Sequence, residues 1–267
     1  EWIEHTFSSW QSVVEPVLFS LTEAMTGLMS PGGPNDPMAA LTQMMGPVLR
    51  RMSAMLYGAQ LAQGLAELST STVTGSEIGL QVLSVPQVVI LPTNIAAAWN
   101  DLDLDPRDVE LYLVLRESAR QRLFNAVSWL GPQLLALVEH YAREIRIDSS
   151  AIEDAIDIDD LSQLTPEKAQ EMSERLRGRL FEPTRTPEQD GVLQRLETLL
   201  ALIEGWVDEV TFQVARTWLP SHDQLAEAVR RRRATSGPAE VFFQSLLGLE
   251  LRPRRVRDAV NLWAALR

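Results

Sequence analysis

Helix starts are marked in this sequence by dipeptides in which a capping side chain precedes a proline. They are Asp36-Pro37, Asp105-Pro106, Thr165-Pro166 and Thr186-Pro187. The side-chain oxygen of the first residue can accept a hydrogen bond from a free backbone N–H, and proline at the first helical position needs no donor. Gln189 follows Thr186 at the spacing of a capping box. These signals favour a chain built mainly from α-helices.

Apolar residues recur at helical spacing behind these starts, and Leu193, Leu196, Leu200 and Ile203 are one example. One segment differs, because Val85–Pro92 is rich in β-branched residues, is bounded by prolines and favours an extended conformation. The sequence therefore predicts a mainly α protein with one or two short β-strands. The predicted helices span about 6–29, 37–68, 106–128, 132–146, 187–218, 221–233, 238–247 and 253–265.

The composition excludes several classes of protein. With 24 Lys+Arg against 36 Asp+Glu, the net charge of -12 makes nucleic acid an unexpected partner. Cysteine is absent, which excludes disulfides, cysteine–zinc sites and thiol nucleophiles. His5, His140 and His222 are too scattered for a histidine-rich metal site. No apolar run is long enough to predict a membrane span.

The organisation of the chain is expected to be simple. We expect one domain over 1–267, with an N-terminal helical part at about 1–80 and a core at about 85–267. The sequence begins at Glu1 and has no signal-peptide pattern. We therefore expect the ordered part of a longer chain, with a cytoplasmic location as the default.

Charged clusters and tryptophans have ordinary structural interpretations. The acidic stretch 144–160 lacks the glycine that a calcium loop needs, which favours a solvated connector. The arginines 230–233 could bind phosphate or an acidic partner. We favour the alternative that they end a helix, complement its dipole and pair internally with the acidic stretch. Trp206, Trp218 and Trp263 are expected to pack in the core or between helices.

The segment Arg116-Glu117-Ser118-Ala119-Arg120 has the spacing of the H-E-x-x-H motif, with arginine at both histidine positions. In a zincin, two histidines one helical turn apart bind one metal ion, and the glutamate polarises the bound water. By itself R-E-x-x-R is more often an exposed helix face with intrahelical ion pairs. The surrounding sequence therefore decides how much weight the spacing carries.

Several blocks in order resemble the actinobacterial zincin-like hydrolase family, a zinc-dependent metalloprotease-like group. Some of its members carry a label of association with coenzyme F420 biosynthesis. The resemblance covers most of the chain from about residue 85 on, and more loosely the part before it. The blocks are Val88–Ile95, Leu111–Phe124, Leu176–Pro187, Glu197–Val210 and Gly248–Asp258 with Leu262-Trp263.

This resemblance implies the roles of particular residues. Positions 116 and 120 would carry the zinc-binding histidines and Glu117 the general base. Glu204, or alternatively Asp208, would supply a third ligand. Arginine stays protonated and has no lone pair for a metal. We therefore expect no metal and no other cofactor in this chain, with Arg116, Arg120 and Glu204 as former ligand positions and Glu117 as a vestigial base.

The leading hypothesis is thus a degenerate zincin-like hydrolase without metalloprotease activity that retains a binding or scaffolding role. Its partner would be a protein or a small molecule. The sequence specifies neither the identity of this partner nor the oligomeric state of the chain itself. Two alternatives stay open, an active hydrolase with nonstandard ligands and a purely structural or assembly protein.

One geometric expectation follows from the missing cation. Carboxylates gathered for a metal would repel each other without it. We expect Arg120, and Arg116 with it, to reach Glu204 or Asp208 in ion pairs of about 4 Å or less.

Overall fold

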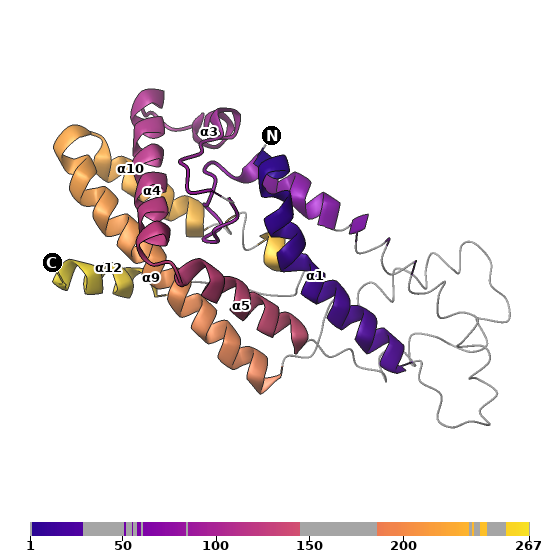
Figure 1. The fold of residues 1–267 in the computed structure, drawn as a ribbon. Coiled ribbons are helices and arrows are strands. Elements are labelled where there is room, and N and C mark those ends of the chain that lie inside the picture. The colour runs from indigo at the N-terminus through magenta and orange to yellow at the C-terminus, as the bar shows by residue number, and fades with distance from the viewer. Residues whose placement is uncertain are drawn as a thin grey trace, which may run out of the picture.

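The computed structural model describes residues 2–28, 51, 55, 58–59, 61–83, 85–144, 186–234, 237, 241–244 and 255–266. The described part is mainly helical, as the sequence predicts (Figure 1). Residues 61–71 form a helical stretch in addition to the labelled helices. These are α1 (Trp2–Leu28), α3 (Pro92–Trp99), α4 (Pro106–Ala126), α5 (Leu130–Arg143), α9 (Pro187–Trp218), α10 (His222–Ala234) and α12 (Val256–Ala265).

Two of the predicted caps start the helices that carry the site. The side chain of Asp105 accepts a hydrogen bond of 2.8 Å from the backbone N–H of Arg107 at the start of α4. Thr186 and Gln189 form the predicted capping box, with reciprocal bonds of 3.1 and 3.0 Å. The bounds of α9 are those predicted. Asp36, Thr165 and the acidic stretch beyond Glu144 lie outside the described residues.

The predicted extended segment is shorter than expected. Ile90 pairs with Thr74 in an isolated antiparallel bridge, and no strand forms within the described ranges. Backbone bonds from Gly75 to Val89 and from Leu91 to Val73 flank that bridge. Prolines at 86 and 92 have no N–H to donate, so the pairing cannot continue along the segment. Pro92 instead starts α3, a helix that the sequence analysis missed.

Helix α9 packs against α4, α5, α10 and α12 and is the centre of the described structure (Figure 1). One hydrophobic cluster joins α1 and the 61–71 stretch to α5 and much of α9; Trp10, Leu68 and Leu196 are among its members. A second cluster joins α3, α4 and α10 to the C-terminal end of α9, and it includes Trp99 and Tyr112. The two clusters hold α4 and α9 side by side.

Close packing of α12 on α9 depends on Gly205. A Cβ atom at this position would lie 2.5 Å from the Cβ of Ala259 and 2.8 Å from its carbonyl carbon. The indole N–H of Trp263 also donates a 2.9 Å hydrogen bond to the carbonyl of Leu202, and Trp206 packs against the larger cluster. The expectation for Trp218 was wrong. This residue ends α9 and is 75% exposed, because the chain turns away there.

No helix in the described ranges combines the length and the apolar character that crossing a membrane requires.

Candidate functional site

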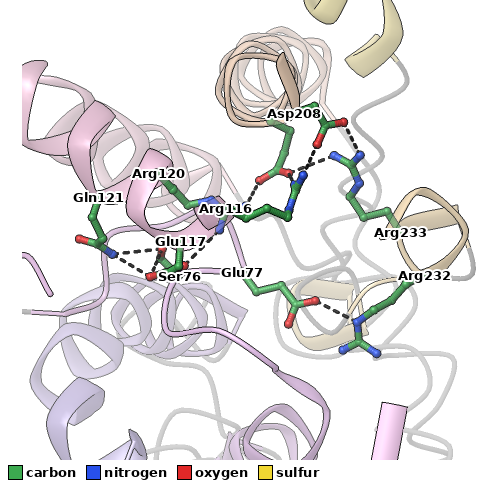
Figure 2. Close-up of polar contacts among 10 residues, drawn as sticks. Ser76, Glu77, Arg116, Glu117, Arg120, Gln121, Asp208, Arg232 and Arg233 are labelled. Atoms are coloured by element: carbon green, nitrogen blue, oxygen red, sulfur yellow. Dashed lines mark hydrogen bonds and ion pairs between the residues drawn. The ribbon is translucent and has the colours of Figure 1, made fainter. Parts of the chain in front are cut away.

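The middle of α4 faces the middle of α9, and charged side chains fill the contact (Figure 2). Arg116 and Arg120 lie one turn apart on α4, and Glu204 and Asp208 lie one turn apart on α9. Arg116, Arg120 and Glu204 are only 5%, 3% and 7% exposed. The R-E-x-x-R segment is therefore a buried helix face, not the exposed face that such a pattern usually indicates.

Both arginines reach the carboxylates of α9, as predicted. Arg116 donates from Nη2 to Oε2 of Glu204 at 3.0 Å, and from Nη1 to Asp208. Arg120 donates from Nη2 to Oε1 of Glu204 at 2.5 Å. The sequence left Glu204 and Asp208 as alternatives, but the structure uses both. The two helices run in opposite directions, so Arg116 lies beside Asp208 and Arg120 beside Glu204.

Arg116, Arg120, Glu204 and Asp208 form a cluster of ion pairs, and a third arginine joins this cluster from α10. Arg233 donates from Nη1 to Oε2 of Glu204 at 3.0 Å and from Nη2 to Oδ2 of Asp208 at 2.6 Å (Figure 2). Its neighbour Arg232 pairs with Glu77 at 3.0 Å. These two arginines thus pair within the chain, whereas the partner expected from the sequence, the acidic stretch beyond Glu144, lies outside the described residues. Their partners in this cluster lie on α9 and in the 72–83 segment.

Glu117 occupies a different environment from the other carboxylates. It is fully buried, and its Oε1 accepts hydrogen bonds from the Ser76 hydroxyl at 2.7 Å and from Gln121 at 2.9 Å. Its Oε2 pairs with Arg120 at 3.2 Å. Every one of these partners holds the carboxylate in the interior. In this arrangement Glu117 ties the 72–83 segment to α4.

Positive charge keeps the α9 carboxylates ionised in spite of their burial. Burial raises the pKa of Glu204, but Arg120, Arg116 and Arg233 together outweigh it and hold that pKa below its usual range. Burial also raises the pKa of Asp208, and Arg116 and Arg233 again lower it below its usual range. The cluster is therefore a set of ion pairs at neutral pH.

A cleft of about 1050 Å³ opens beside this cluster. Arg116, Arg120, Glu204 and Asp208 contribute to its lining, whereas Glu117 does not. Much of the remaining wall is apolar, with Val73, Ile78, Leu113, Phe212 and Val229 among its residues. The cleft wall thus combines the ion-paired side chains with apolar side chains and with further charged residues such as Glu209 and Arg230.

Sequence reasoning missed Arg233, Gln121 and Ser76 as members of this network. A signal for Arg233 exists, because it lies four residues after Val229, on the helix face that also buries Leu225 and Ala226. Gln121 likewise lies one turn after Glu117. No signal marks Ser76, which stands outside the described helices and meets Glu117 only through the tertiary fold.

The profile of a family described as zincin-like metallopeptidase matches residues 1–267. The chain belongs to the zincin-like metallopeptidase family. No curated protein and no solved structure matches it.

The residues present do not fit the zinc ion that a zincin-like metallopeptidase implies. A zinc site needs lone pairs from imidazole, thiolate or carboxylate groups. Arg116 and Arg120 offer none, and they already occupy oxygens of Glu204 and Asp208. The three histidines lie on α1, α5 and α10, and no metal-binding group of three His, Asp or Glu residues forms within the described ranges.

Proposed function

We propose that this member of the zincin-like metallopeptidase family has a degenerate H-E-x-x-H motif and acts by binding, without metal-dependent hydrolysis. The observation that carries this proposal is the bonding of Arg116 and Arg120. Both terminal nitrogens of each arginine donate to carboxylates of the cluster. The positive charge that these carboxylates need is supplied by side chains of the chain itself.

The position of Glu117 supports the loss of hydrolysis. A general base must reach the water that it activates, directly or through one other water. Glu117 is fully buried, is held by Ser76, Gln121 and Arg120, and is not part of the cleft wall. An active hydrolase with nonstandard groups, the first alternative, would therefore need a base other than Glu117.

The cleft favours a binding role over a purely structural one. A structural protein has no need for an open cavity beside its buried ion pairs, whereas a ligand site is concave and largely apolar with a few polar groups. The cleft is concave and has apolar side chains in its wall, Val73, Leu113 and Phe212 among them, although its lining is richer in charged groups than that of an ordinary ligand site. The ligand would be a protein segment or a small molecule with an apolar surface.

The test combines metal analysis with an activity assay. Protein purified without chelator is expected to hold well below one zinc per chain, by elemental analysis, and to leave mixed peptides and unfolded protein uncut with or without added zinc. The Glu117→Gln variant, prepared in the same way, is the matched control. Stoichiometric, tightly held zinc, or peptidase activity that the wild type has and Glu117→Gln lacks, would contradict the proposal.

A further inference from the structure

We infer that Arg233 is the third cation of this site, so that three arginines on two helices, not the two at the motif positions alone, keep a metal ion out. This inference rests on the proposed function. It has a direct consequence: histidines at positions 116 and 120 would not by themselves restore an unhindered zinc site.

Arg233 occupies one oxygen of each α9 carboxylate, Glu204 and Asp208, that a metal could otherwise bind. Its two terminal nitrogens lie 3.0 Å from Oε2 of Glu204 and 2.6 Å from Oδ2 of Asp208. Oε2 of Glu204 also accepts from Arg116 at 3.0 Å. With Arg116 and Arg120 both replaced, one oxygen of each α9 carboxylate would still be bound to a guanidinium, and a dication approaching that oxygen would meet a fixed positive charge.

The charges of the cluster balance only when Arg233 is included. Glu117, Glu204 and Asp208 carry three negative charges, and Arg116, Arg120 and Arg233 carry three positive charges. Both terminal nitrogens of each arginine are already bonded to a carboxylate. The three guanidinium groups are therefore not a free anion site either, although arginine clusters commonly bind phosphate.

The fold holds Arg233 in this position. One face of α10 is buried and carries Leu225, Ala226 and Val229. Arg233 lies one turn after Val229 on the same face, which is turned toward α9. Arg232 anchors the same turn of α10 by its bonds to Glu77 and to the carbonyl of Ser71. By contrast, Arg230 pairs with Glu227 of its own helix, and its side chain is 57% exposed. Arg230 is thus a matched control on the same helix and beside the same cleft.

The experiment compares zinc affinities of three variants by competition with a chromogenic chelator. They are Arg116→His/Arg120→His, the same pair with Arg233→Gln, and the same pair with Arg230→Gln. We expect Arg233→Gln to tighten zinc binding by about 10-fold or more, the scale on which groups beside a metal ligand act. Arg230→Gln is expected to leave the affinity of the double variant unchanged.

Several outcomes would overturn the inference: equal affinity with and without Arg233, the same gain from Arg230→Gln, or no zinc binding by a folded Arg233→Gln triple variant. None of these bears on the proposed function, which is tested by zinc and activity in the wild type. If the histidine variants do not fold, the role of Arg233 is tested by single substitutions in the wild-type protein. There Arg233→Gln should lower Tm by at least about 3 °C and Arg230→Gln by less than about 1 °C, and equal shifts would refute the role of Arg233.

Discussion

Arg116 and Glu204 form a buried ion pair of 3.0 Å between α4 and α9, although they stand 88 positions apart in the chain. The pair has little access to solvent, with side chains only 6% and 10% exposed. Removing one partner of such a pair leaves an uncompensated charge in the interior, which costs more than the pair itself contributes. The consequences of this burial can be measured.

Arg120→Ala is expected to destabilise the protein by about 3–5 kcal/mol, because Glu117 and Glu204 both lose a cation. Adding Glu204→Gln should recover part of this loss, since it removes the charge left without that partner. Urea unfolding of the two variants measures the recovery. The control is Arg143→Ala, whose pair with Glu139 is exposed and should contribute less than about 1 kcal/mol. A double variant no more stable than Arg120→Ala would show that the two residues are not coupled.

The cluster should also make stability depend on acid pH. The pKa values of Glu204 and Asp208 are lower in the folded protein than their usual range, so their ionised forms favour folding above the unfolded pKa values of about 4. This stabilisation is lost as the pH falls below about 4 and through the lower folded pKa values. Unfolding free energies at about pH 7, 5, 4 and 3 would measure the loss. Glu204→Gln/Asp208→Asn should show a smaller decline below pH 4 than the wild type, and an identical decline would contradict the assignment.

Gly205→Ala is expected to cost about 1–3 kcal/mol, because the new Cβ would lie 2.5 Å from Ala259 and α12 would have to shift. The control lies in the same helix. Gly191 has nothing within 4 Å of an added Cβ, so Gly191→Ala should stabilise α9 by about 0.5–1 kcal/mol. Thermal melts of the two variants should therefore shift in opposite directions. A stabilised Gly205→Ala variant would mean that α12 does not pack closely at this position.

Ser76→Ala should destabilise the protein by about 1–3 kcal/mol, because the fully buried Glu117 loses the hydroxyl that lies 2.7 Å from its Oε1. Ser12→Ala is the control, since the Ser12 hydroxyl bonds to Ser8 on an exposed face of α1 and should matter by less than about 0.5 kcal/mol. Chemical denaturation compares the two variants. Equal and small effects would exclude Ser76 as an anchor of Glu117.

Local signals in the sequence determined the helices that carry the site. Asp105 before Pro106 and Thr186 before Pro187 mark the starts of α4 and α9, because a cap and a proline act on their own turn of helix. The spacing of Arg116 and Arg120 likewise sets them on one face, since residues four apart are neighbours on any helix. The ion pairs from Arg116 and Arg120 to α9 could also be expected from charge, because the family resemblance implied that the two helices face each other.

The tertiary structure alone decided how the charges are balanced. Arg233 lies on α10 and Ser76 in the 72–83 segment, and both reach the ion pairs between α4 and α9. The positions of these two segments are set by packing contacts between residues far apart in the chain. The tertiary structure also decided that Glu117 faces the interior whereas Glu204 faces the cleft. Both residues stand on helices that the sequence predicts. Helical periodicity defines which residues share a face. Which charged groups meet across that face depends on the relative positions of helices far apart in the chain, and no local pattern encodes those positions.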